Sequence, residues 1–94
     1  MSQFTESKNT AVFTTKYVIN HKVLIANVFR YDDGSWQFSG TETHLQDSDY
    51  MVVSLGQILS RDNSIEELAN LPLGYWTKRN NEGDKWIIAR LSNS

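Results

Sequence analysis

Short runs of β-branched and aromatic residues, set between polar segments, dominate the first half of the chain. Residues 11–15 (AVFTT) and 22–31 (KVLIANVFRY) are two such runs, and neither contains a proline or a glycine. Both predict β-strands, joined through a turn at Asn20 and His21. Apolar side chains alternate onto both faces of the second run: Leu24, Ala26 and Val28 on one face, Val23, Ile25 and Phe29 on the other. This pattern indicates a central strand that is covered on both sides.

The segment 30–42 (RYDDGSWQFSGTE) combines acids, a glycine and large aromatic residues. Asp33-Gly34 is a strong signal for a two-residue hairpin turn of type I′, which needs positive φ at both central positions. Such a turn sets the register of the two strands. It places two aromatic pairs on one face of the sheet: Tyr31 with Trp36, and Phe29 with Phe38. Folding alone then accounts for the composition of this stretch.

A polar loop over 41–49 and a short strand over 50–53 lead into two helices. Ser54 and Gln57 fit a capping box, in which the serine side chain caps the first helical turn. Ser64 and Glu67 fit a second box, which predicts another helix directly after the first. The proline and glycine that follow mark the end of this second helix.

Residues 75–80 (YWTKRN) and 85–90 (KWIIAR) predict two more strands, joined in a second hairpin. The predicted order is therefore three strands, a short strand, two helices and two strands. Strands that pair locally favour an antiparallel arrangement. We expect an α+β fold: a largely antiparallel sheet of about five to six strands with two short consecutive helices on one side.

Length and composition fit one domain. The chain has 94 residues, of which 39% are hydrophobic and 21% charged, and it has no cysteine for disulfides or thiolate metal sites. We expect a flexible N-terminal arm over 1–10, a single α+β domain over 11–91, and a tail over 92–94. No apolar run approaches the ~20 residues of a membrane span, and the start MSQFTESKNT lacks the pattern of a secretory signal. The expected location is the cytoplasm.

The formal net charge is only −2, but it is unevenly spread. Residues 32–67 hold eight acidic residues against a single base, Arg61. Because phosphate contacts need lysine and arginine, this segment argues against nucleic acid as a partner. It suits a basic protein instead. We take five acids as candidate partner-binding residues: Asp32, Asp33, Glu42, Asp47 and Asp49. The competing interpretation is that these acids only solvate loops.

Motifs for catalysis and cofactor binding are missing. The sequence has no GxxxxGK[ST] or GxGxxG loop for nucleotides and no GxSxG nucleophile elbow. Residues 41–49 bring four potential metal ligands together: Glu42, His44, Asp47 and Asp49. Their spacing lacks the rhythm of a calcium loop, and a single imidazole is too few for a typical zinc site. We therefore predict no catalytic residue, no metal site and no cofactor, and a protein that is not an enzyme.

The aromatic residues allow two interpretations. Tryptophans and tyrosines on strands can form a stacking platform for bases or sugars. More often they form the core of a small sheet. We favour the core for Trp36 and Trp86, and both interpretations stay open for Tyr75 and Trp76.

The segment 52–76 (VVSLGQILSRDNSIEELANLPLGYW), with 12–19 (VFTTKYVI) and 33–40 (DGSWQFSG), resembles a family of small bacterial domains of unknown function. That family is grouped with the immunity proteins of polymorphic toxin systems, as immunity protein thirty-three. The resemblance runs from Val12 to Trp86. Its motifs are structural: Trp36-Gln37-Phe38, Val53-Ser54-Leu55, and Leu71-Pro72 with Gly74. In the family pattern a proline follows the aspartate at the second helix, where this chain has Asp62-Asn63-Ser64.

The resemblance implies a cytoplasmic α+β protein that binds and neutralises a cognate toxin. It transfers no catalytic residue to this chain. The acidic segment over 32–67 is similar to the surfaces that many such inhibitors turn toward basic toxins. The alternative function is a small-molecule-binding or regulatory module.

Overall fold

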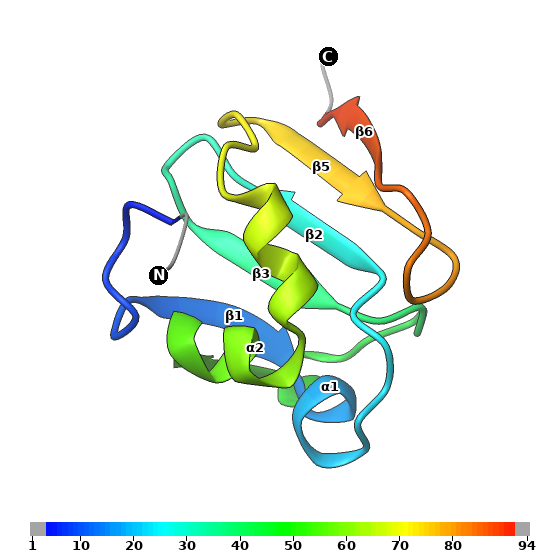
Figure 1. The fold of residues 1–94 in the computed structure, drawn as a ribbon. Helices are drawn as coiled ribbons and strands as arrows, with labels where there is room; N and C mark the ends of the chain where they lie inside the picture. The colour runs from blue at the N-terminus through cyan, green and yellow to red at the C-terminus, as the bar shows by residue number, and fades with distance from the viewer. Residues whose placement is uncertain (1–3, 92–94) are drawn as a thin grey trace.

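Six strands form one mixed sheet in the computed structural model, which describes residues 4–91 (Figure 1). Their order across the sheet is β4-β1-β3-β2-β5-β6, and only β1 and β3 run parallel. The strands are β1 (Ala11–Thr15), β2 (Asn27–Arg30), β3 (Trp36–Ser39), β4 (Tyr50–Ser54), β5 (Tyr75–Lys78) and β6 (Ile87–Arg90). The helical elements are α1 (Lys16–Asn20), the 3₁₀ turn η1 (Asp47–Asp49), α2 (Leu55–Arg61) and the 3₁₀ helix η2 (Asn63–Leu68). This architecture confirms the predicted α+β class.

The hydrophobic core lies between the sheet and the two consecutive helices α2 and η2, which cross in front of the strands in Figure 1. Strands and helices contribute alike to it: Val12, Val28, Trp36 and Phe38 from the sheet, and Leu55, Ile58, Ile65 and Leu68 from the helices. All eight side chains are almost completely withdrawn from solvent. Burial of this one sheet face supplies most of the hydrophobic free energy of folding.

One of the two predicted helix caps is confirmed and the other is wrong. Ser54 Oγ accepts a hydrogen bond of 3.1 Å from the Gln57 amide, so α2 begins where the capping box places it. The second helix is capped by Asp62 instead of Ser64, because Asp62 Oδ1 accepts from both the Ser64 amide and the Ser64 hydroxyl, at 3.0 and 2.7 Å. An aspartate accepts as readily as a serine at this position, and here it lies two residues earlier.

The predicted register of the β2–β3 hairpin is wrong by one residue. The loop has three residues, 32–34: the Gly34 amide donates to Tyr31 O, and the Tyr31 amide donates to Ser35 O, each at 2.9 Å. Asp33 Oδ1 accepts from the Ser35 amide at 2.9 Å, and Gly34 takes a φ of +90°, a combination typical of a three-residue turn with a bulge. The observed cross-strand partners are Arg30 with Trp36, Phe29 with Gln37, and Val28 with Phe38. The predicted pairs, Tyr31 with Trp36 and Phe29 with Phe38, therefore lie on opposite faces of the sheet.

The segment between β1 and β2 also departs from the prediction. Residues 16–20 form α1, whose first turn is capped by Thr15 Oγ1, and of the predicted strand over 22–31 only Asn27–Arg30 is regular. Val28 is fully buried, whereas Phe29 on the opposite face is half-buried. The strand is central, but it is not covered on both sides.

Residues 4–10 pack against the domain, contrary to the expectation of a loose arm. The Phe4 side chain is 6% exposed and meets Trp36 edge-on, with the ring centres 5.2 Å apart. The backbone of the segment also pairs with the start of α2, since the Leu55 amide donates to Thr10 O and the Gly56 amide to Lys8 O. The rest of the predicted arm, 1–3, and the predicted tail, 92–94, lie outside the described residues.

Arg79 follows β5 and is a buried charge, 4% exposed. Its guanidinium forms an ion pair with Asp62 and donates to Ile25 O and Ser64 Oγ, both at 3.1 Å. It also stacks over Trp86, with 4.2 Å between its central carbon and the ring centre. These contacts join the end of β5 to the start of η2 and to the segment before β2.

Candidate functional site

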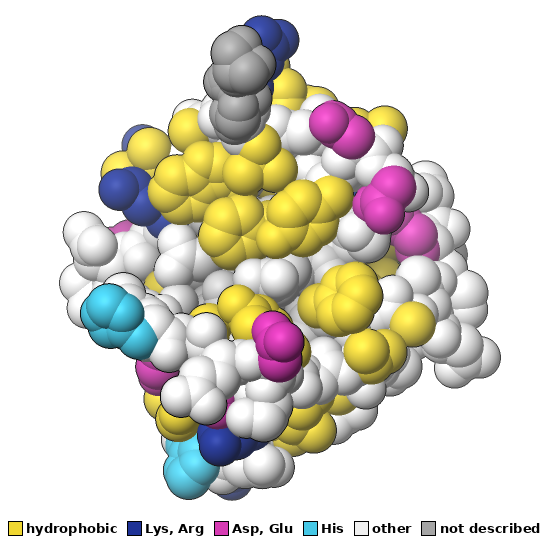
Figure 2. All heavy atoms as spheres, turned by 180° about the vertical axis from the view of Figure 1, so that it is seen from behind, with side chains coloured by type: hydrophobic (Ala, Val, Ile, Leu, Met, Phe, Trp, Pro, Cys, Tyr) yellow, Lys and Arg dark blue, Asp and Glu magenta, His cyan; other side chains and the backbone are white. Residues whose placement is uncertain are grey.

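The sheet face opposite α2 and η2 exposes a row of aromatic side chains. Strand alternation, register and ring stacking place several large apolar residues on this open face, among them Phe13, Phe29, Tyr31, Tyr50, Val52 and Trp76. Phe13 is 43% exposed, Tyr50 38% and Val52 61%, values that are high for large apolar groups on a sheet. Figure 2 shows hydrophobic side chains gathered over this face, with acidic side chains among them and along the margin. An apolar patch with a polar rim is typical of an interaction surface.

The aromatic rings on the open face are ordered by stacking. Phe29 stacks on Trp76 and on Tyr31, with ring centres 5.7 and 6.0 Å apart. Lys78 covers part of the Trp76 ring at 5.8 Å. Because Phe29, Tyr31 and Trp76 hold one another in place, this part of the face is preorganised and loses little side-chain entropy when a partner covers it.

A hollow of about 340 Å³ lies within the open face. Five residues from separate elements line it: Phe13, Tyr31, Gln37, Asp47 and Tyr50. The Tyr31 hydroxyl donates to Gln37 Oε1 at 3.3 Å. Burial, together with the neighbouring Tyr50, raises the pKa of Tyr31 above its ordinary value, so this hydroxyl stays protonated near neutral pH. The hollow therefore combines three aromatic walls with one carboxylate.

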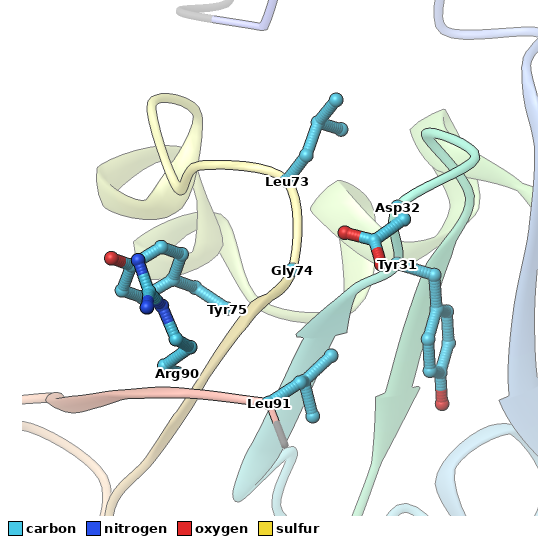
Figure 3. A pocket seen from close by; sticks show the side chains of 7 residues that line it. All are labelled: Tyr31, Asp32, Leu73, Gly74, Tyr75, Arg90 and Leu91. Atoms are coloured by element: carbon cyan, nitrogen blue, oxygen red, sulfur yellow. The ribbon is translucent and has the colours of Figure 1, made fainter. Parts of the chain in front are cut away.

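A larger cavity of about 710 Å³ lies at the C-terminal end of β2, where the chain enters β5 (Figure 3), and Tyr31 lines both this cavity and the hollow. Asp32 stands on one side of Gly74, and Arg90 lies on the other side against the Tyr75 ring, 5.7 Å from its centre. Asp32 Oδ1 lies so close to Gly74 that a β-carbon there would come within 2.7 Å of it. Leu73 and Leu91 supply apolar walls. The volume falls within the range of small-molecule sites.

The five candidate acids do not form one patch. Asp32 and Asp33 lie in the turn before β3, whereas Glu42, Asp47 and Asp49 follow the other end of β3. The open face separates the two groups.

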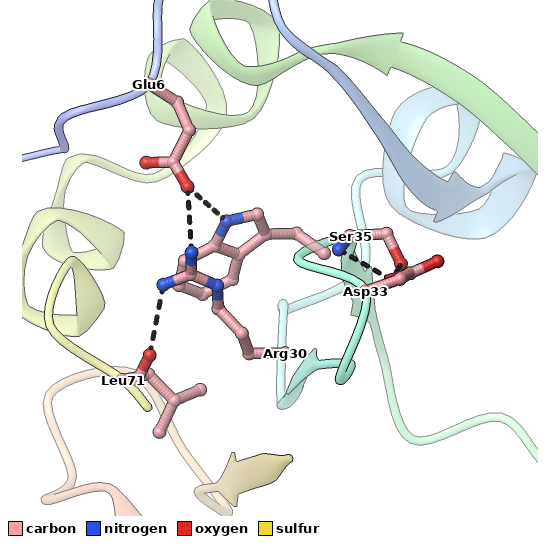
Figure 4. Close-up of polar contacts among 6 residues, drawn as sticks. Glu6, Arg30, Asp33, Ser35 and Leu71 are labelled. Atoms are coloured by element: carbon pink, nitrogen blue, oxygen red, sulfur yellow. Dashed lines mark hydrogen bonds and ion pairs between the residues drawn. The ribbon is translucent and has the colours of Figure 1, made fainter. Parts of the chain in front are cut away.

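Two of these acids also have local structural roles, and a third is partly buried without a hydrogen-bond partner. Hydrogen bonds from Ser35 lower the pKa of Asp33 and fix the turn, as Figure 4 shows. The Gln46 amide and Lys16 lower the pKa of Asp49, which is 8% exposed and pairs with Lys16 at 3.1 Å. Glu42 turns one carboxylate oxygen inward toward Gly40. Within residues 4–91, Asp32 and Asp47 form no hydrogen bond or ion pair through their side chains, so these two are the acids best placed for a partner.

Glu6, which the sequence analysis did not single out, joins a cluster on the helix side of the sheet (Figure 4). Its carboxylate accepts from the Trp36 indole at 3.0 Å and from Arg30 at 3.3 Å, while Arg30 also donates to Leu71 O at 3.2 Å. Burial raises the pKa of Glu6, but the bond from Trp36 and the charge of Arg30 outweigh it and leave the pKa lowered. This cluster anchors residues 4–10 and is structural.

The tryptophans divide between the two sides of the sheet. Trp36 is buried, as predicted, and Trp86 packs half-buried against the core. Tyr75 also packs against the core, whereas Trp76 lies on the open face. Over the described range, His, Asp and Glu side chains form no group of three or more that could hold a metal ion. No helix in residues 4–91 is long and apolar enough to cross a membrane.

The fold and this face together define an α+β protein with one covered and one open sheet surface. Neither a protein-family model, nor a curated protein, nor a solved structure matches the chain. The resemblance to immunity proteins therefore stays a prediction from the sequence.

Proposed function

We propose that this chain is a non-catalytic protein-binding module that covers and neutralises a basic partner, such as a toxin, with its open sheet face. The observation behind this proposal is the exposure of Phe13, Tyr50 and Val52 beside the carboxylate of Asp47. The sequence resemblance to toxin-immunity proteins supports the identity of the partner. The excess of acidic residues over 32–67 supports a partner with a positive charge.

Aromatic side chains dominate the binding energy of protein interfaces, because they bury a large area at a low cost in side-chain entropy. Phe29, Tyr31 and Trp76 already stack in a fixed arrangement. Carboxylates at the margin would draw in a basic protein and speed its association. A stable complex buries about 800 Å² on each partner, which requires most of the face to take part.

The test is to express the chain with the product of its neighbouring gene and to measure association at low and at high salt. We expect tight binding whose association rate falls as salt rises. Val52→Arg should abolish it, because a long cation beside Phe13 and Tyr50 blocks docking and repels a basic partner. Val52 is 61% exposed on edge strand β4, so the fold should tolerate the change.

Glu67→Arg is the matched control, since it adds an arginine on exposed η2, on the helix side of the sheet. It should leave binding intact. Binding that Val52→Arg does not weaken would contradict the use of the open face. The absence of any neighbour-encoded partner would contradict the proposed function.

The cavity beside Gly74 favours the second candidate, a small-molecule-binding or regulatory module. A ligand with both an acidic and a basic group would match Arg90 and Asp32 on its two sides. A rise in melting temperature with amino acids or short peptides, removed by Arg90→Gln, would support this candidate.

A further inference from the structure

The hollow on the open face has the composition of a binding site for a cation. Phe13, Tyr31 and Tyr50 offer ring faces and edges, and Asp47 offers a carboxylate. The remaining polar groups are the two tyrosine hydroxyls and the Gln37 amide, whose oxygen already accepts a hydrogen bond from the Tyr31 hydroxyl. No lysine or arginine is among the lining residues. A single negative charge beside aromatic walls attracts a cation through both its charge and the ring quadrupoles.

Elsewhere in the structure, lysine and arginine side chains of this chain pack over aromatic rings. Five lie over aromatic rings at 4.2–5.8 Å from the ring centre: Lys16 over Tyr17, Arg30 over Trp36, Lys78 over Trp76, Arg79 over Trp86, and Arg90 over Tyr75. Across the described residues, no such cation lies over the rings that line the hollow. The rings of Phe13, Tyr31 and Tyr50 are therefore available to a cation of a binding partner.

The charge at the hollow is also left uncompensated. Lys16 is the base of the neighbouring segment, and it is engaged by Asp49 at 3.1 Å. Asp47, two residues earlier, is exposed and forms no ion pair within residues 4–91. Asp47 thus gives the hollow one negative charge, and the nearby Lys16 does not compensate it because Lys16 is paired with Asp49.

We propose that this hollow receives a cationic side chain of the basic partner, arginine in preference to lysine. The inference rests on the proposed function and specifies the contact at the centre of the interface. A planar guanidinium can stack on one ring while its N–H groups reach a carboxylate, which a compact ammonium does less well. The hollow is shallow and open to solvent, and its volume of about 340 Å³ leaves room for one long side chain lying along the rings.

The first experiment needs no partner. Nα-acetyl-L-arginine amide is titrated into the ¹⁵N-labelled chain, followed by NMR, with the corresponding citrulline amide as the uncharged probe of the same shape. We expect saturable shifts at the backbone amides of residues 13, 37, 47 and 50 with the arginine probe and none with citrulline. The lysine amide should bind more weakly. Equal shifts with arginine and citrulline, or no shifts, would overturn the inference.

Variants separate the roles of charge and ring. Asp47→Asn should weaken binding of the arginine probe about threefold to tenfold, as expected for one close charge contact. Tyr50→Ala should weaken it similarly, and Tyr50→Phe should restore it, because the ring contributes more than the hydroxyl. Glu67→Gln, which removes one exposed carboxylate on the helix side, should change nothing. Unfolding midpoints show whether each variant still folds. If a Tyr50 variant does not fold, the effect of Asp47→Asn on binding of the arginine probe tests the inference by itself.

The same variants distinguish this inference from the proposed function. If a neighbour-encoded protein binds Asp47→Asn and Tyr50→Ala as tightly as it binds the natural chain, the cation site is wrong and the function stands. If the arginine probe binds as expected but no such protein binds at all, the site stands and the proposed function is wrong.

Discussion

Arg79→Leu should destabilise the fold more than any single surface change. The substitution removes a guanidinium that is buried among Asp62, Ser64 and Ile25 O. Asp62 then keeps a poorly solvated carboxylate without its counter-charge, and the Ile25 carbonyl loses a donor. The stacking of the guanidinium on Trp86 is lost as well.

The largest part of the cost is the loss of the ion pair with Asp62. Breaking a buried ion pair by removing one partner costs about 3–5 kcal/mol, because the remaining charge is left uncompensated. The lost hydrogen bonds are part of that cost and are not added to it. A domain of this length has a total stability of about 5–14 kcal/mol, so the loss is a large fraction. The melting temperature should fall by at least about 12 °C.

Urea denaturation followed by tryptophan fluorescence measures this loss. Asp62→Asn, which keeps a cap oxygen but removes the charge, should also destabilise the fold. The double variant should cost clearly less than the sum of the two single changes, because both act on one ion pair. A cost below about 1 kcal/mol for Arg79→Leu, or strictly additive losses, would refute the reasoning.

Three further changes test local features. Ser54→Ala should lose about 0.5–2 kcal/mol and Ser54→Asp much less, because only alanine removes the acceptor of the helix cap; equal urea midpoints for all three proteins would contradict this. Gly34→Val should lose more than about 1 kcal/mol through strain at its φ of +90°, and Gly34→Asn less, as thermal unfolding can measure. The lowered pKa of Glu6 stabilises the fold above the ordinary value of 4.5, and this contribution disappears as pH falls through the folded pKa. Unfolding midpoints of Glu6→Gln should therefore approach those of the natural chain as the pH falls below 4.5 and through the folded pKa of Glu6, and a gap that does not change with pH would argue against it.

Local signals in the sequence predicted the elements that depend on neighbouring residues. The start of α2 follows from the Ser54 side chain, which acts within one helical turn. The pairing of β5 with β6 follows from the two predicted strands, although the regular strands are shorter than predicted and residues 79–86 connect them. In each case the interacting groups lie close together in the chain, so their spacing holds the necessary information.

The hairpin at residues 32–34 shows where local signals become ambiguous. Two aspartates precede Gly34, so the same sequence fits either of two turns. One is a two-residue turn formed by Asp33 and Gly34, and the other is a three-residue turn that begins at Asp32. The carboxylate of Asp33 decides between them by accepting from Ser35. That choice shifts the register by one residue, and it moves Phe29 and Tyr31 away from the core.

The hollow could not be predicted because its residues are far apart in the sequence. Phe13 and Tyr50 become neighbours only through the pairing of β1 with β4. Tyr31 joins them only because β1 runs parallel to β3. Apolar residues occupy successive positions in both β1 and β4, so the sequence pattern does not reveal which face stays uncovered. The burial of Phe4 depends in the same way on the orientation of Trp36.

The position of β1 determines the order in which the chain can acquire its structure. Although β1 is the first strand to be synthesised, both of its partners come later: β3 lies across a long crossover, and β4 follows that. The β2–β3 and β5–β6 hairpins can close locally, and β4 has no neighbour until β1 is in place. Closing the chain between β1 and β4 costs conformational entropy, which is offset only when the contacts of the complete sheet have formed. Until residues 50–54 are synthesised and pair as β4, the outer edge of β1 has no partner and is open to other strands.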